Sequence, residues 1–456
     1  MSPTPARTRH HLLGALGAVT LLTACALGPG SPASAASRAA AHSVTVDLAD
    51  TSGPVTGVGS GFLYGLTEDG SGPGDDLLAP LEPTSGRGGG ARLDGGGWAG
   101  DGYTAGPGYE RRVTSALAQA RRLTTAPYHG TYDLLVSDVW GADTTQAPDT
   151  VYPCADGDCG NWESFLRRLA QDVRASGLDV RLDVWNEPTG AFFPPGFNTE
   201  QYYGMWDTAV RVLREELPGM PLVGPSLWDY SPGNIGPFLD HAKAAGTVPD
   251  VLNWHFSQDP VADAASARGL LAARGLDGVA LSMNEYLHAD EQHAGHQAWY
   301  LARLAASGIP SASHAIWDDC CAAGTLDGVL ARDGSGALRR TGQWWVYEAY
   351  AKLDGVYART TADGPLDAVA AVDAGAHSAG VLLGAASGGA TDTDLTLRGL
   401  SGLGGTTVTV RRVPDAAPLD APVTVSTTEV PAGTDTLTVP LRPESGQDAF
   451  SVSITG

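Results

Sequence analysis

The chain has 456 residues, a length typical of two or three domains, and 43% of them are hydrophobic, which is enough for a large core. Its formal net charge of −23 argues against nucleic acid as a partner, because such a chain repels phosphates, and it also disfavours an anionic polymer as a substrate. A neutral partner fits this charge better.

Residues 1–41 have the pattern of an export signal followed by a tether. Two arginines precede an apolar run at 12–27, which is too short to span a bilayer comfortably. Two cleavage sites are compatible with this pattern. "LTAC" at 22–25 resembles a lipobox, in which Cys25 becomes a lipid anchor, whereas "ASA" at 33–35 resembles an ordinary signal-peptidase site. Either site predicts a protein that is secreted or is lipid-anchored at the outer face of the cell membrane.

Export makes disulfides plausible, and four cysteines remain when Cys25 is set apart. They allow three pairings. Cys154 and Cys159 would close a small loop, and Cys320 and Cys321 could form a vicinal bridge. A zinc site is the alternative, but the C-x-x-C spacing and nearby histidines that favour zinc are missing.

Short apolar runs alternate with helical patterns from residue 42 to residue 355. The expected strands cover 56–66, 90–96, 131–140, 179–186, 220–228, 250–256, 278–286 and 310–319. The expected helices cover 109–123, 161–177, 199–217, 234–246, 263–275, 296–308 and 342–355. Eight strands, most of them followed by a helix, predict a (β/α)8 TIM barrel of the α/β class.

A doubly wound open sheet is the alternative to the barrel. It would be expected to carry a Gly-rich phosphate-binding turn after a strand. The stretch "SGRGGGARLDGGGW" at 85–98 is rich in glycine, but it has neither the G-x-G-x-x-G register nor a helix after it. We expect this stretch, which overlaps the second predicted strand, to form a long loop.

The texture of the sequence changes after residue 355. Thr- and Val-rich runs such as "TTVTVRRV" and "PVTVSTTEV" repeat about every ten residues through 356–456. They predict an all-β sandwich domain. Its polar residues are typical of exposed strand faces, so we expect a supporting role, with independent sugar binding as the alternative.

Two glutamates follow predicted barrel strands. Glu187, in "WNEP", comes directly after the fourth strand, and Glu285, in "NEY", ends the seventh. The active site of such a barrel lies at the carboxyl ends of its strands, so both side chains are expected in one mouth. Two facing carboxylates are the equipment for glycoside hydrolysis, in which one donates a proton and the other attacks the anomeric carbon.

Other polar and aromatic side chains are expected around the same mouth. The predicted substrate contacts are Asn186, His255, Trp317, Tyr286, Trp140 and Trp228. Several of them have structural alternatives. His255 and Trp317 could be packed in the core, and strand alternation could turn Tyr286 away from the mouth. Asp183, within the fourth strand, is expected to pair with an arginine.

"WNEP" and the distant "NEY" resemble the motifs of the clan A glycoside hydrolases, which are retaining (β/α)8 enzymes. The resemblance covers residues 55–355. It implies that Glu187 is the acid/base, that Glu285 is the nucleophile and that Asn186 binds a sugar 2-hydroxyl, with no metal or organic cofactor. Within the clan, a barrel with a trailing β-sandwich is most similar to family 39. That family includes β-xylosidases and enzymes that act on arabinose-containing side chains.

The expected function is therefore a retaining glycoside hydrolase whose partner is a neutral carbohydrate, with pentose-containing plant glycans as the substrate class. Alternatives are an endo-acting glycanase on another neutral polysaccharide, a catalytically silent carbohydrate-binding barrel, and a metal-dependent barrel hydrolase. "HADEQHAGH" at 288–296 bears on the last, since it offers three histidines and two acids. It lacks the H-E-x-x-H spacing, so a solvated loop is expected there.

Overall fold

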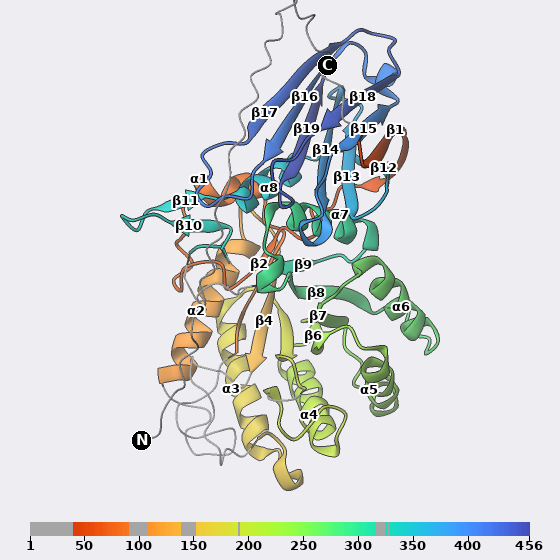
Figure 1. Ribbon diagram of the computed structural model, residues 1–456. Coiled ribbons are helices and arrows are strands. Elements are labelled where there is room, and N and C mark those ends of the chain that lie inside the picture. The colour runs from red at the N-terminus through yellow and green to blue at the C-terminus, as the bar shows by residue number, and fades with distance from the viewer. Residues whose placement is uncertain (1–39, 91–106, 138–151, 190–191, 316–323, 327) are drawn as a thin grey trace, which may run out of the picture. The chain divides into compact units, whose positions relative to one another are not determined.

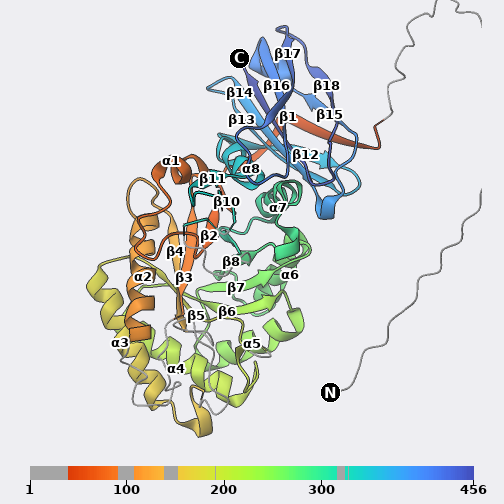
Figure 2. The same ribbon diagram turned by 60° about the vertical axis from the view of Figure 1, so that its left-hand side comes forward.

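Eight parallel strands close into a barrel and follow one another around it in chain order. They are β2 (Gly61–Leu63), β3 (Ser85–Gly89), β4 (Thr131–Ser137), β5 (Arg181–Trp185), β6 (Leu222–Asp229), β7 (Val251–Phe256), β8 (Ala280–Tyr286) and β9 (Ala312–His314). The computed structural model describes residues 40–90, 107–137, 152–189, 192–315, 324–326 and 328–456. Figures 1 and 2 show the barrel from two sides, and the predicted TIM barrel is confirmed.

Six helices each follow a barrel strand and pack outside the barrel, and a seventh, α8, follows the hairpin of β10 (Leu330–Arg332) and β11 (Leu338–Arg340). They are α2 (Pro107–Thr124), α3 (Gly160–Ser176), α4 (Glu200–Glu216), α5 (Pro232–Ala245), α6 (Pro260–Ala272), α7 (Ala294–Ser307) and α8 (Gly342–Ala351); a short helix, α1 (Asp75–Leu78), follows β2. Each of the seven overlaps a predicted helix. In α3, Phe165, Leu169 and Val173 recur every four residues on the buried face, and Gly177 ends the helix at φ 67°. Thr199 caps α4 by accepting a hydrogen bond from the backbone N–H of Tyr202.

The second barrel strand differs from the prediction. β3 occupies Ser85–Gly89, inside the stretch that was expected to be a loop. A Cβ atom at Gly86 would lie 2.4 Å from a side-chain atom of Leu123, and one at Gly88 would lie 2.4 Å from the hydroxyl of Tyr132. The glycines are therefore required by close packing, and their low strand propensity hides the strand from sequence analysis.

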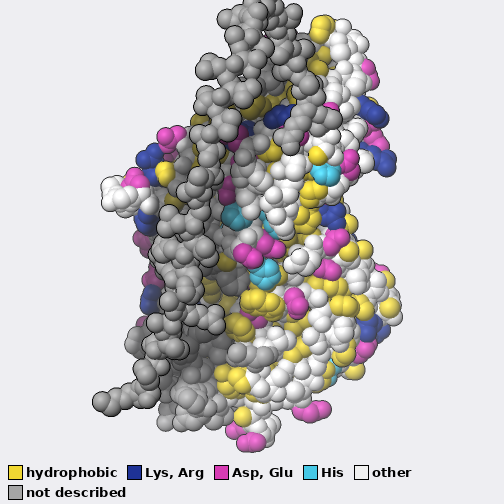
Figure 3. Space-filling model, in the orientation of Figure 1, with side chains coloured by type: hydrophobic (Ala, Val, Ile, Leu, Met, Phe, Trp, Pro, Cys, Tyr) yellow, Lys and Arg dark blue, Asp and Glu magenta, His cyan; other side chains and the backbone are white. Residues whose placement is uncertain are grey.

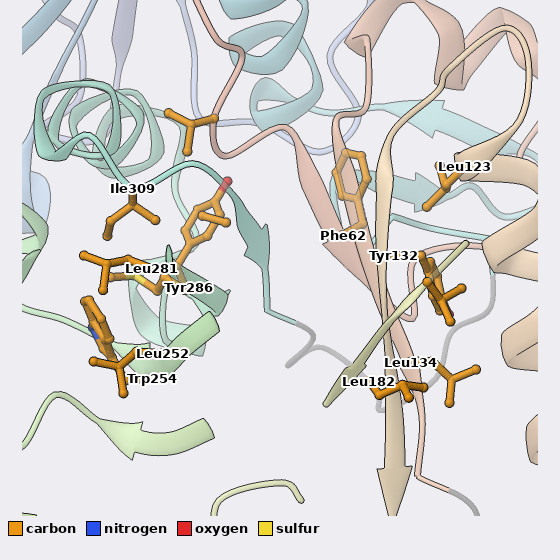
Figure 4. Packing of buried hydrophobic residues seen from close by; sticks show 14 of the residues in the cluster. Phe62, Leu123, Tyr132, Leu134, Leu182, Leu252, Trp254, Leu281, Tyr286 and Ile309 are labelled. Atoms are coloured by element: carbon orange, nitrogen blue, oxygen red, sulfur yellow. The ribbon is translucent and has the colours of Figure 1, made fainter. Parts of the chain in front are cut away.

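The main hydrophobic core lies between the barrel strands and the surrounding helices. It includes fully buried tryptophans such as Trp162, Trp206 and Trp254. Figure 4 shows part of this core, with Leu281, Tyr286 and Ile309 side by side. Because these apolar side chains pack outside the barrel strands, the inside of the barrel is left to polar residues.

A second sheet has nine strands and its own core. In spatial order it runs β17 (Val423–Val430), β16 (Thr406–Val413), β19 (Ala449–Thr455), β14 (Ser378–Ala385), β13 (Leu366–Asp373), β12 (Val356–Ala362), β1 (His42–Pro54), β15 (Thr393–Arg398) and β18 (Thr436–Leu441). All of the neighbouring pairs are antiparallel except β1 with β15. The predicted C-terminal β-sandwich is confirmed.

The sheet also contains a strand from the other end of the chain. β1 pairs antiparallel with β12 and parallel with β15, and it is drawn in red among blue strands in Figure 1. Val44, Val46 and Leu48 alternate along β1 and are buried in the core of this sheet. The pairing corrects the N-terminal end of the predicted 42–355 barrel, which instead begins with β2.

Helix α7 packs directly on the second sheet. The backbone N–H of Gly295 donates to the carbonyl of Gln447 over 2.7 Å, and Arg303 forms an ion pair with Asp367 in β13 at 3.3 Å. A Cβ atom at Gly384, in β14, would lie 2.0 Å from the carbonyl oxygen of Gly295. The helix and the strand therefore approach so closely that only glycine fits at position 384 without a shift of the backbone.

Cys154 and Cys159 form a disulfide just before α3, which is one of the predicted pairings and leaves neither sulfur for zinc. Cys25, Cys320 and Cys321 lie outside the described residues, as does the predicted export signal. None of the helices in the described ranges is both long enough and apolar enough to cross a membrane.

Candidate active site

Glu187 and Glu285 lie together at the carboxyl ends of β5 and β8. Their side chains are almost completely buried. One carboxylate oxygen of each, together with a ring nitrogen of His255 in β7, forms a group whose atoms all lie within 4.8 Å of one another. The structure thus brings together two distant glutamates and a histidine that the sequence placed at three strand ends.

Glu187 has an unusual backbone conformation. Its φ is 47°, in the left-handed region that residues other than glycine rarely adopt. Its N–H donates to the carbonyl oxygen of Ser226 in the neighbouring strand β6 at 2.9 Å. Such conformations cost energy and persist where neighbouring contacts hold them, often at functional sites. Here the turn carries the Glu187 side chain toward His255.

Glu285 is placed by an irregularity in β8. The pairing of β8 with β9 shifts register between Met283 and Tyr286. Asn284 binds polar side chains inside the barrel, and Glu285 is directed to the same side. A bulge of this kind lets two consecutive side chains share one face of a strand.

The same bulge turns Tyr286 outward, so the predicted contact of this residue with the substrate is corrected. Its ring is fully buried in the core, and its hydroxyl donates to the carbonyl oxygen of Gly59 at 2.5 Å and contacts the hydroxyl of Tyr347. Figure 4 shows the ring among hydrophobic side chains.

Arg87, in β3, is a central residue of the site that sequence analysis missed. It is buried, and its three guanidinium nitrogens bind three different residues. Nε donates to Asp183 at 2.7 Å, Nη2 donates to Oδ1 of Asn186 at 2.9 Å, and Nη1 forms an ion pair with Glu285. The only signal in the sequence was a charged residue within a glycine-rich run.

A polar network fills the barrel below the two glutamates. Asn284 Nδ2 donates to Asp133 and to Asp183, each at 3.0 Å. Ser226 donates to Asp183 at 2.5 Å, and Asn253 donates to Ser226 at 3.0 Å. Burial raises the pKa of Asp183, although Arg87 and Ser226 oppose the shift. The predicted pairing of Asp183 with an arginine is confirmed.

His255 links the two glutamates. Its Nδ1 lies 2.7 Å from Oε1 of Glu187 and 3.5 Å from Oε1 of Glu285. Burial, helped by the charge of Arg87, holds the pKa of His255 well below its usual range, so the ring is neutral near pH 7. A neutral imidazole can exchange a hydrogen bond with Glu187 in either protonation state of that glutamate.

One of the predicted aromatic contacts lies beside the site within the described residues. Trp228, at the end of β6, is 36% exposed. Its ring packs at 5.1 Å from Phe256 and at 5.8 Å from His288, which follow His255 and Glu285 along the chain. Trp140 and Trp317 lie outside the described residues.

Glu187, His255 and Glu285 also have the composition of a metal site. However, the positively charged guanidinium of Arg87 pairs with Glu285, and a cation beside it would be repelled. This arrangement suits proton transfer and nucleophilic attack better than it suits a divalent ion.

The histidines of residues 288–296 are engaged separately. His288 stacks on Phe256 at 3.9 Å, and His293 pairs with Asp415 at 2.7 Å. His296 accepts a hydrogen bond from the backbone N–H of Ser387 at 3.3 Å. These side chains therefore support the packing of this segment and do not converge on a common centre.

The face shown in Figure 3 gathers acidic side chains and histidines near its middle, next to hydrophobic side chains, while most of its Lys and Arg side chains lie toward the edges. This distribution agrees with the net charge of −23. It favours a neutral ligand over an anionic one on this face.

Comparisons with known proteins give a consistent fold. No protein-family profile matches the chain. A 3-O-alpha-D-galactosyl-alpha-L-arabinofuranosidase of Bifidobacterium longum subsp. longum is 25% identical in an alignment over 439 residues, and the alignment covers 82% of this chain but only 36% of that relative. The chain thus spans little more than a third of the length of the curated relative that it matches.

Solved structures resemble the chain over nearly its whole length. N2152 from Neocallimastix frontalis has a TM-score of 0.73 at 21% identity, with 91% of this chain and 99% of that chain covered. A GH39 enzyme from Xanthomonas axonopodis pv. citri has a TM-score of 0.63 at 14% identity, with 93% and 99% covered. The chain therefore has the barrel-and-sandwich fold of clan A-type glycoside hydrolases, a fold that several families of that clan share.

Proposed function

We propose that the protein is a retaining glycoside hydrolase in which Glu187 is the acid/base and Glu285 is the nucleophile. The observation that carries the proposal is the pair of buried carboxylates, in which an oxygen of one lies within 4.8 Å of an oxygen of the other. Inverting enzymes need about 6.5–9.5 Å between the carboxyl groups to admit a water molecule, whereas retaining enzymes use about 5–5.5 Å. The spacing here therefore favours double displacement.

The two steps follow from these positions. In the first, Glu285 attacks the anomeric carbon while Glu187 gives its proton to the departing oxygen, so that an ester forms between the sugar and Glu285. In the second, the Glu187 carboxylate takes a proton from water as the water attacks the same carbon, and Glu285 leaves as a carboxylate. Glu187 ends the cycle protonated, as it began.

The neighbouring residues suit these roles. The ion pair with Arg87 stabilises Glu285 as a carboxylate, the form that attacks. His255, neutral and 2.7 Å from Glu187, can stay hydrogen-bonded while that residue loses and regains its proton. Asn186 has its Oδ1 occupied by Arg87, so its amide N–H groups remain to donate to a sugar hydroxyl.

For the substrate we propose neutral, pentose-containing plant glycans. Three likenesses support this class. The curated relative is named for an arabinofuranoside, and the similar structures include a β-xylosidase from Caulobacter crescentus and an endoxylanase from Clostridium papyrosolvens. The negative charge of the chain agrees with a neutral glycan.

A substrate panel tests the proposal. The wild-type protein and Glu285→Ala would be assayed on aryl glycosides of xylose, arabinose, glucose and galactose in both anomeric forms, and on arabinoxylan. We expect turnover of at least one pentoside by the wild type and a loss of about 10⁴-fold or more in the variant, because no intermediate can form. Full activity in Glu285→Ala, or an inactive wild type across the whole panel, would contradict the proposal. Activity that persists in excess chelator is also expected.

A further inference from the structure

Asp183, in β5, is linked to the nucleophile candidate Glu285 through Arg87, which forms ion pairs with both carboxylates. Its side chain is completely buried, and one of its oxygens lies 2.7 Å from Nε of Arg87. We propose that Asp183 is a positioning residue, which fixes the guanidinium of Arg87 so that it faces Glu285 and Asn186 at the same time. The inference rests on the proposed function, and it adds Asp183, a residue inside the barrel, to the groups on which that function depends.

The planar geometry of the guanidinium links Asp183 to both of the other partners of Arg87. The group is planar, so a partner on Nε determines the directions of both Nη atoms. With Nε on Asp183, Nη1 points to Glu285 and Nη2 points to Oδ1 of Asn186 at 2.9 Å. Without the charge of Asp183, the guanidinium is expected to turn toward Glu285, its remaining carboxylate partner, and to lose the contact with Asn186.

Asp183 is itself held from two other strands. Ser226 in β6 donates to its Oδ1 at 2.5 Å, and Asn284 in β8 donates to its Oδ2 at 3.0 Å. The position of Arg87 is thus determined by β5, β6 and β8 together. A buried ion pair by itself is weak evidence for stability, because desolvation of both charges offsets their attraction. The contacts of Arg87 with two site residues point to a role beyond stability.

The charges give a second consequence. Two carboxylates, Asp183 and Glu285, share the single guanidinium of Arg87. The other titratable side chains near this group include Glu187 and His255 at the mouth, Asp133, which also binds Asn284, and the tyrosines Tyr64, Tyr132 and Tyr202. When Asp183 is made neutral, the charge of Arg87 acts on Glu285 alone, which favours the ionised nucleophile. The acid limb of the kcat/KM profile should then move to lower pH.

The test compares Asp183→Asn with Asp133→Asn on an aryl glycoside that the wild type cleaves. Asp133 is a matched control, since it is equally buried and also binds Asn284 at 3.0 Å, while its remaining ion pair is to Arg181. For Asp183→Asn we expect kcat to fall about 10- to 100-fold, as for a small misplacement of a reacting group, with KM changed less than about 3-fold. Its acid limb should shift to lower pH. Asp133→Asn leaves Arg87 paired with Asp183, so it should change kcat and the acid limb much less than Asp183→Asn does.

A double-mutant cycle separates positioning from general loss of structure. If Asp183 acts through Arg87, Asp183→Asn should cost much less in an Arg87→Lys background than in the wild type. The proposal would be overturned if Asp183→Asn kept the kcat and the acid limb of the wild type, or if Asp133→Asn showed the same changes as Asp183→Asn. Full additivity of the two substitutions in the cycle would also overturn it.

Ser226→Ala serves if Asp183→Asn does not fold, because it keeps the charge and removes one anchor of Asp183. It should lower kcat to a smaller extent without moving the acid limb, and an unchanged kcat would overturn the proposal. The two proposals fail differently. An inactive wild type or an active Glu285→Ala contradicts the proposed function. If the wild type is active and depends on Glu285, the proposed function stands, and the results for Asp183→Asn then decide this inference alone.

Discussion

Asn186 shows how much a single side chain can determine at this site. Arg87 occupies its Oδ1, so only its N–H groups can reach the substrate. Since Asn186 directly precedes Glu187, its amide is expected to lie beside the sugar whose glycosidic bond is cleaved. A hydrogen bond from this amide to the sugar 2-hydroxyl would strengthen as charge develops on the ring in the transition state.

Replacement of Asn186 tests this contact. We expect Asn186→Ala to lower kcat/KM by about 10²- to 10³-fold on an aryl glycoside that carries a 2-hydroxyl, the range seen when a transition-state donor is removed. On the matching 2-deoxy glycoside, the same variant should differ from the wild type by much less. Equal losses on both substrates would show that Asn186 acts on something other than the 2-hydroxyl.

At the scale of elements, α7 and β14 pack very closely against each other, and a glycine in β14 makes this approach possible. A Cβ atom at Gly384 would lie 2.0 Å from the carbonyl oxygen of Gly295 and 2.7 Å from the backbone nitrogen of Trp299. Neither neighbour is a flexible side chain, so the helix and the sheet would have to separate.

Gly384→Ala is therefore expected to lower the free energy of unfolding by about 1–3 kcal/mol or more, the usual cost of overpacking. Gly269→Ala is the control, since nothing lies within 4 Å of its Cβ position and the residue is within α6. The control should be neutral or stabilise the protein by up to about 1 kcal/mol. Denaturant unfolding would measure both. A neutral Gly384→Ala would show that the sheet can shift at no cost.

The elements also show what the sequence can and cannot predict. Alternating apolar runs and helical periodicity were sufficient to predict the barrel, and the positions of two glutamates at strand ends were sufficient to predict that Glu187 and Glu285 lie close together. β3 was missed because its glycines are selected by packing against Tyr132 and Leu123, a tertiary effect that local propensity does not contain. The outward turn of Tyr286 depends on a bulge, and bulges leave no clear mark in a single sequence.

At the scale of the whole molecule, β1 and the strands after residue 355 form one sheet. β1 lies between β12 and β15, and no local pattern in residues 42–54 reveals partners more than 300 residues away. The sequence predicted a β-rich module after residue 355 but could not indicate that an N-terminal strand completes it.

Global stability should depend on pH through buried histidines. Burial lowers the pKa of His314 to about 4, and its ring packs against Tyr286 and Tyr347. In the unfolded chain the pKa is about 6.5, so the unfolded state takes up a proton first as the pH falls. The neutral ring makes its full contribution to the free energy of unfolding above about pH 6.5. This contribution falls by up to about 3 kcal/mol as the pH decreases to about 4.

His314→Gln isolates this effect. Between pH 7 and pH 4.5 the wild type should lose about 2–3 kcal/mol more unfolding free energy than the variant. His255 acts in the same direction in both proteins, and the raised pKa of Asp183 opposes it in both, so the difference belongs to His314. Parallel pH profiles of the two proteins, measured by urea unfolding, would contradict the account.

The most direct test of the account is the configuration of the glycosyl azides that the two glutamate variants produce with an activated aryl pentoside. In Glu285→Ala, azide should replace the missing nucleophile while Glu187 still protonates the leaving group, so the azide product should be inverted. In Glu187→Ala, Glu285 should still form the ester and azide should displace it, so the product should retain the configuration of the substrate. Proton NMR of the anomeric signal distinguishes the two. The same configuration from both variants, or the reverse assignment, would contradict the proposed roles of Glu187 and Glu285.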